Sequence, residues 1–130
     1  MRKVDMNLKS KKTYNILAPV SLGELIDKMT ILEIKQMHMT GIKLENVDKE
    51  LKLLKYILQD KNLEIDIDLI NNLKEVNKSL WEIEDNIRIK ESIQEFDKDF
   101  IRLARSVYKE NDKRASIKKA INLKYNSELV

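Results

Sequence analysis

Apolar residues recur at helical spacing from the first third of the chain onward. The first run consists of Leu22, Leu25, Ile26, Met29, Leu32 and Met37. Pro19 disfavours a helix through Ala18, while Ser21 followed by Glu24 forms a capping-box motif. The pattern therefore predicts a helix that begins after Ser21 and continues until Gly41.

A second helix is predicted over residues 43–60. Its apolar positions Val47, Leu51, Leu54 and Leu58 are spaced 4, 3 and 4, as in a coiled coil. The short turn at Gly41 indicates that the first two helices form an antiparallel hairpin. Residues 61–67 are expected to be a connection, with Asp66 or Asp68 capping the next helix.

The second half of the chain is predicted to hold two long helices and one short helix. The long ones cover residues 67–91 and 93–109, and the short one is expected to begin at a cap formed by Asn111 or Asp112. Residues 13–20 are expected to be a short extended segment that lies across the bundle. The predicted fold is all-α, an antiparallel helical hairpin or bundle of four to five helices with an N-terminal extended segment.

Turn-forming residues are scarce, which supports long helices. The chain contains two glycines and one proline, and none of them lies after Gly41. All-β and α/β folds need many tight turns, so both classes are disfavoured, and Asn and Asp must supply the later breaks. The predicted division is a basic N-terminal tail or extended segment over residues 1–17 and one helical domain over residues 18–130.

Composition narrows the classes of function. The chain has no cysteine and one histidine, so thiolate chemistry is excluded and we expect no metal and no cofactor. No run of apolar residues is long enough to span a membrane, so we expect a cytoplasmic protein with no membrane contact. Residues 1–17 hold five basic residues and one acidic residue, whereas the rest is nearly balanced, which disfavours a nucleic-acid partner.

Polar residues inside the apolar arcs are the first candidates for function. Projection of the first helix places Asp27, Lys28, Lys35 and His38 on its polar side, but Glu33 within its apolar stripe. On the third predicted helix the interrupting residues are Asn77, Glu84 and Arg88, in the sector of Trp81. We expect Glu33, Asn77, Trp81, Glu84 and Arg88 to form either a polar pocket or a buried structural network, with catalytic residues unknown.

Two further groups are weaker candidates. Arg105, Asn111 and Arg114 are a secondary candidate for an anion site, although solvated charges explain them more simply. The carboxylate pairs Glu24/Asp27, Glu45/Asp48 and Glu82/Asp85 have the spacing that all-helical nucleotide pyrophosphohydrolases use for magnesium. Three such pairs are no more than chance predicts for a chain with 22 carboxylates.

Three blocks of the sequence resemble a known family. They are APVSLGELIDKMTILEIK (18–35), WEIEDNIR (81–88) and FIRLARSVYKENDKRASIKKAIN (100–122). Together they are similar to an uncharacterised bacterial and phage family of small all-helical proteins, one of the domain-of-unknown-function families. The resemblance implies an all-helical fold and no assigned activity, substrate or cofactor.

Two classes of function stay open at this point. The favoured hypothesis is a helical interaction or structural module that self-associates, because long apolar seams would leave apolar surface exposed on a monomer. The alternative is a small all-α enzyme or ligand binder, similar to a magnesium-dependent nucleotide hydrolase, with a polar pocket between the first and third helices. A homodimer is the expected assembly, and a different protein partner is the other assembly considered.

Overall fold

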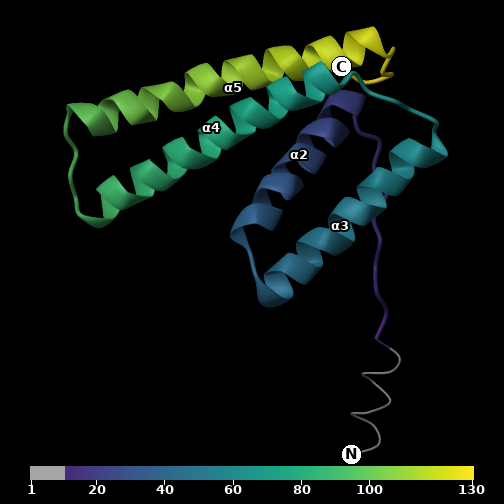
Figure 1. Cartoon of the computed structure of the whole chain (residues 1–130), viewed down its shortest axis with the longest axis horizontal. Coiled ribbons are helices and arrows are strands. Elements are labelled where there is room, and N and C mark those ends of the chain that lie inside the picture. The colour runs from purple at the N-terminus through teal and green to yellow at the C-terminus, as the bar shows by residue number, and fades with distance from the viewer. Residues whose placement is uncertain (1–10) are drawn as a thin grey trace, which may run out of the picture.

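The computed structural model describes residues 11–130 and contains four helices, labelled α2 to α5 in Figure 1. They are α2 (Leu22–His38), α3 (Gly41–Asp60), α4 (Ile67–Ser92) and α5 (Lys98–Lys124). The fold is all-α with no strand within residues 11–130, as the sequence predicts. None of the described helices is long and apolar enough to cross a membrane. The predicted basic tail lies largely outside the described residues.

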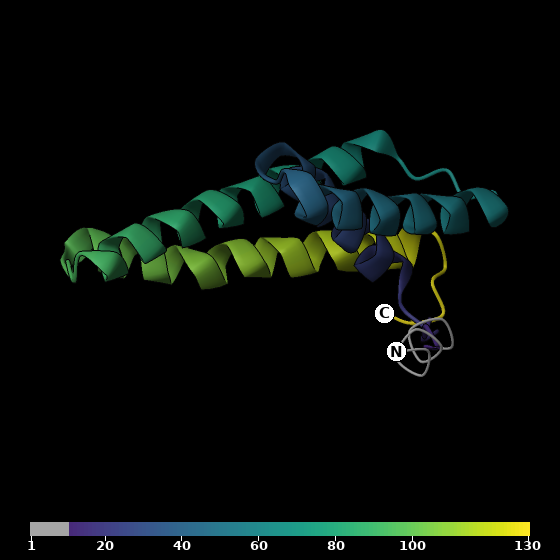
Figure 2. The same ribbon diagram turned by 90° about the horizontal axis from the view of Figure 1, so that it is seen from below.

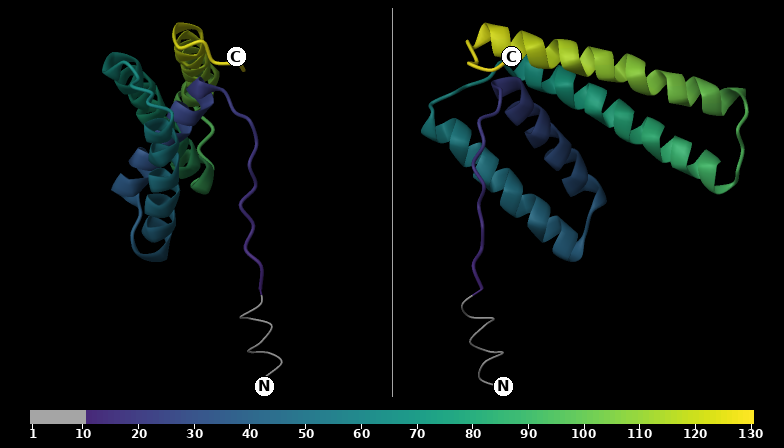
Figure 3. Two further views of the ribbon diagram at one scale, coloured as in Figure 1. Left: turned by 90° about the vertical axis from the view of Figure 1, so that its right-hand side faces the viewer. Right: turned by 180° about the vertical axis from the view of Figure 1, so that it is seen from behind.

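The helices are arranged as two antiparallel hairpins that splay apart (Figures 1 and 3). The first hairpin pairs α2 with α3 and the second pairs α4 with α5, whereas α2 packs on all three other helices. Viewed from below, α2 and α3 overlie only the half of the second hairpin that contains the end of α5 (Figure 2). Helix α2 is therefore the central element of the fold.

The helix ends follow the local chemistry that the sequence predicts. Ser21 caps α2 by accepting a hydrogen bond from the backbone N–H of Glu24 at 3.1 Å. Asp66 caps α4 and accepts from the N–H of Asp68 at 2.9 Å. The left-handed backbone positions after Gly41 fall on Asn62, Gln94 and Asn126. Asparagine tolerates this conformation, so it supplies breaks where glycine is missing.

The second half of the second hairpin differs from the prediction. A single helix, α5, runs from Lys98 to Lys124, so the predicted break at Asn111 or Asp112 and the separate short helix are wrong. The predicted start at Ile93 is also wrong, because residues 93–97 form the connection and Asp97 caps α5. Asn and Asp inside a helix each cost less than about 1 kcal/mol, which continuous backbone bonding and packing offset.

The core lies where α2 meets the other helices. Its buried apolar cluster includes Ile26 and Leu32 of α2, Leu51 of α3, Leu73 of α4 and Ile121 of α5. Met37 is an exception to the predicted apolar stripe of the first helix, because it is exposed in the last turn. The core therefore joins both hairpins through one central helix.

The segment before α2 is neither helix nor strand over residues 11–20. It runs beside α3, where Ile16, Leu17 and Val20 line a shallow depression together with Leu53 and Tyr56. All five side chains are exposed, so the segment touches the bundle lightly. The segment is not helical, as predicted, but it runs along α3 and does not cross the bundle.

Candidate functional site

A buried aspartate joins three helices. Asp27 on α2 is 1% exposed and accepts hydrogen bonds from both Nε, at 2.8 Å, and Nη2 of Arg114 on α5. The side-chain amide of Asn77 on α4 donates to the same carboxylate at 2.9 Å and also to Thr30 Oγ1 at 2.9 Å. Thr30 in turn donates to the backbone carbonyl of Asp27. A two-pronged guanidinium–carboxylate pair of this kind fixes both distance and direction.

The surroundings of Asp27 keep its carboxylate ionised. Burial by itself raises the pKa of Asp27, but the hydrogen bonds from Arg114 and Asn77 and the charges of Arg114 and Lys118 outweigh it and lower the pKa overall. The hydrogen bond to Asp27 is the main reason why the pKa of Arg114 is raised. Both shifts favour the charged forms, so the pair is an ion pair at neutral pH.

The first turn of α2 approaches the backbone of α5 closely. The N–H of Gly23 donates to Oδ1 of Asn122 at 2.6 Å, and both residues are buried. A Cβ atom at position 23 would collide with the carbonyl oxygen of Lys118, so only glycine fits. Above this contact the Lys118 ammonium pairs with the carboxylate of Glu24. The start of α2 is thus locked on α5 by shape, hydrogen bonding and charge.

The residues of the predicted polar network do not come together in the structure. Asn77 is buried, as expected, but its partner is Asp27 rather than Glu33. Glu84 and Arg88 lie on the surface with side chains 51% and 72% exposed, so the expectation that they point inward is wrong. The end of α4 lies beyond the contact with α2 and packs on α5 alone among the described helices.

Glu33 lies at the edge of the first hairpin, where its side chain is 31% exposed and pairs with Lys74 of α4 at 3.1 Å. Asp27 was expected on the polar side of its helix, and this prediction is wrong, because α2 is covered on two sides. The buried charged residue of this helix is therefore Asp27, whereas Glu33 makes a partly exposed ion pair.

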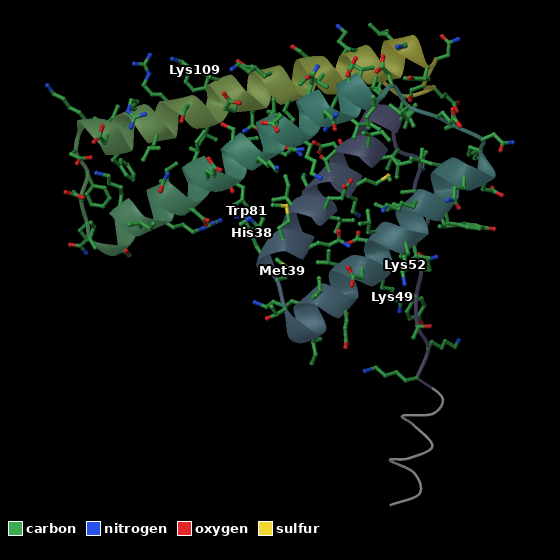
Figure 4. The ribbon with its side chains drawn as sticks, viewed as in Figure 1. His38, Met39, Lys49, Lys52, Trp81 and Lys109 are labelled. Atoms are coloured by element: carbon green, nitrogen blue, oxygen red, sulfur yellow. The ribbon has the colours of Figure 1, made fainter. Side chains whose placement is uncertain are left out.

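Trp81 makes a stacking contact instead of lining a pocket. Its ring stacks on the imidazole of His38 with centroids 4.7 Å apart and planes inclined by 17°. Figure 4 shows the pair between the end of α2 and the middle of α4, with Met39 close by. The indole Nε1 is buried and has no hydrogen-bond partner among the described residues. The stack closes the junction at the point where α2 ends.

The secondary anion candidates do not converge. The guanidinium of Arg114 is engaged by Asp27, and its Nη1 reaches Asn111 Oδ1 at the long distance of 3.5 Å. Arg105 is exposed on another face of α5 and has no ion-pair partner within residues 11–130. These three residues therefore form no common anion-binding pocket.

No metal centre is evident from the side chains. Within residues 11–130, no group of three or more His, Asp or Glu side chains gathers closely enough to hold a metal ion. In the three carboxylate pairs with hydrolase-like spacing, four members have partners of their own: Glu24, Asp27, Asp48 and Asp85. The alternative of a magnesium-dependent hydrolase gains no support from this geometry.

An exposed helical arm is the other prominent feature. We call residues 82–112 the arm; it contains the end of α4, the connection and the first half of α5. No residue in the arm is buried. Its exposed large apolar side chains are Ile89, Ile93, Phe96, Ile101 and Tyr108. The arm projects beyond the first hairpin, so no third helix covers it (Figures 1 and 2).

An all-helical chain of two hairpins, joined by a buried ion-pair network and extended by an uncovered arm, is the class of protein that this geometry defines. Residues 16–130 match the model of DUF6165, a family of unknown function, and the chain belongs to this family. Comparisons with curated proteins and with solved structures give no match.

Proposed function

We propose that this protein is a helical interaction module that self-associates through its arm. The single observation that carries the proposal is that residues 82–112 contain no buried side chain although both helices carry apolar residues throughout. Soluble monomers rarely leave a long apolar stripe of this kind uncovered. A second copy of the arm would supply two further helices and complete a four-helix arrangement.

The other half of the same hairpin shows what a third helix does. Where α2 crosses α4 and α5, the side chains of Leu73, Leu80 and Ile121 are buried. Farther out, the equivalent seam residues Ile87 and Leu103 stay partly exposed. Two helices alone therefore leave the seam of the arm partly exposed to solvent. Burial of such side chains contributes about 25 cal/mol for each Å² covered, before the entropic cost of association.

Sedimentation velocity over a range of about 1–100 µM tests the proposal on the full chain. We expect a dimer at micromolar concentration that dissociates on dilution. Tyr108→Glu places a charge on the arm and should shift the chain towards monomer. Tyr56→Glu is the matched control, because Tyr56 is also an exposed helical tyrosine but lies on α3. A wild-type chain that stays monomeric at every concentration would overturn the proposal.

A further inference from the structure

Helix α5 carries two periodic stripes of mostly apolar residues, of which only one is packed against another helix of the chain. The first stripe faces α4 and consists of Phe100, Leu103, Val107, Ile117 and Ile121, all buried or partly buried. The second stripe consists of Ile101, Ala104, Tyr108, Asn111 and Ala115, all exposed. At 100° per residue the two stripes lie about 100° apart around the helix. The second stripe thus faces sideways, about at right angles to the contact with α4.

The second stripe has the spacing of a helix-packing seam. Its intervals of 3, 4, 3 and 4 residues place its members at alternate a and d positions of a heptad. The stripe contains two small residues, Ala104 and Ala115, on either side of Tyr108 and Asn111. Such a seam is suited to one helix running along it, because small residues admit the backbone of a partner closely.

From these observations we infer that the second stripe of α5 pairs with the same stripe of a second copy in antiparallel orientation. This inference rests on the proposed self-association and specifies its register. In antiparallel helix pairs, a positions lie opposite d positions. Ala104 then lies opposite Ala115 of the second copy and Tyr108 opposite Asn111, around a two-fold axis between residues 109 and 110. Each contact occurs twice, as an isologous interface requires.

Charge next to the stripe fits the antiparallel register. Arg105 and Asp112 occupy successive e positions, which lie beside the e positions of an antiparallel partner. Both side chains are exposed, and neither has an ion-pair partner within residues 11–130. In the register proposed here, Arg105 lies beside Asp112 of the second copy, and the reciprocal pair forms across the axis.

A parallel arrangement would leave Arg105 and Asp112 without oppositely charged partners. Parallel partners pair e positions with g positions, and the preceding g positions of α5 are Phe100 and Val107. Arg105 and Asp112 would then face apolar side chains of the second copy. The two charges therefore favour antiparallel pairing and a second copy of this chain as the occupant.

Charge reversal and exchange on the full chain test this register. Arg105→Glu or Asp112→Arg alone replaces two attractive contacts per dimer with two repulsive ones, so each should raise the dimer Kd about tenfold at low salt. The double variant Arg105→Glu/Asp112→Arg restores both attractions and should return the Kd to within about threefold of wild type. An equimolar mixture of the two single variants should form heterodimers in preference to either homodimer.

Lys109→Glu is the matched control, because Lys109 points away from α4 on the outer side of α5 (Figure 4). It should leave the Kd within about twofold of wild type, and circular dichroism should show unchanged helicity for all variants. Failure of the double variant and of the mixture to recover dimerisation would overturn the antiparallel register. A dimer indifferent to every reversal would do the same while leaving self-association intact. A chain that is monomeric at all concentrations would overturn both the register and the proposed self-association. A different protein would then be the remaining candidate to bind the stripe.

Discussion

Replacement of Asp27 by asparagine tests whether the buried ion pair holds the two hairpins together. The change keeps the size of the side chain but removes the charge that receives Nε and Nη2 of Arg114. The amide nitrogen introduced in place of one oxygen can only donate, so it must face a donor of Arg114 or of Asn77. The substituted side chain therefore cannot satisfy all of its neighbours.

The burial of the two partners sets the expected size of the effect. Removal of one partner from a fully buried ion pair costs about 3–5 kcal/mol of unfolding free energy. The side chain of Arg114 is 28% exposed, whereas that of Asp27 is 1% exposed, so the guanidinium can regain part of its hydration. We therefore expect a loss of about 2–3 kcal/mol, which lowers the Tm of a domain of this size by about 10 °C.

Urea denaturation followed by circular dichroism measures the change directly. Asp85→Asn is the matched control, because Asp85 makes an exposed ion pair with Arg88 at 3.4 Å within the same helix. That substitution should cost less than about 0.5 kcal/mol. If Asp27→Asn were as mild as the control, the buried pair would not be what fixes α2 against α4 and α5.

Acid provides a second readout of the same pair. The pKa of Asp27 is lower in the folded chain than its ordinary value, because hydrogen bonds from Arg114 and Asn77 outweigh the effect of burial. Its contribution to stability is then fully present above the unfolded pKa of about 4 and is lost as the pH falls through the lower folded value. The difference in unfolding free energy between wild type and Asp27→Asn should be constant near neutrality and shrink below about pH 4.

Three other substitutions examine the junction. Gly23→Ala should cost about 2 kcal/mol or more in urea denaturation, because the added methyl group meets the carbonyl of Lys118, and a loss below 0.5 kcal/mol would contradict that close approach. Ser21→Ala removes the cap of α2 and should cost about 1 kcal/mol in the same assay. His38→Ala should change the fluorescence of Trp81, the sole tryptophan, while altering stability by about 1 kcal/mol or less; an unchanged spectrum would argue against the stack in solution.

Much of the fold could be predicted from the sequence because its signals are local. Pro19 and Ser21 mark the start of α2, and Asp66 marks the start of α4, each through chemistry confined to a few residues. The continuation of α5 past Asn111 could not be predicted in this way, because a polar residue that caps one helix is tolerated inside another. The difference depends on partners from distant parts of the chain, such as the pairing of Arg114 with Asp27.

The site was harder to predict, and α2 shows why. A helix with one buried face carries its polar residues on the opposite face, which is the rule that assigned Asp27 to solvent. Helix α2 is instead buried on two faces, and the second face contains Gly23, Asp27, Thr30 and Ile34 at intervals of 4, 3 and 4. This second periodic set was present in the sequence, but a stripe of one glycine and two polar residues has too little hydrophobic contrast to identify it as buried.

Helices α2 and α5 each carry a second periodic stripe of residues. On α2, a second periodic stripe is covered because α4 and α5 pack over it, and its polar members find partners there. On α5, a second periodic stripe of comparable spacing remains uncovered, and its flanking charges Arg105 and Asp112 have no partners within residues 11–130. The second stripe of α2 is covered by neighbouring helices, and by analogy the second stripe of α5 should be covered by a partner helix. That partner must carry charges complementary to Arg105 and Asp112 at the same spacing. A second copy of α5 in antiparallel orientation meets that condition.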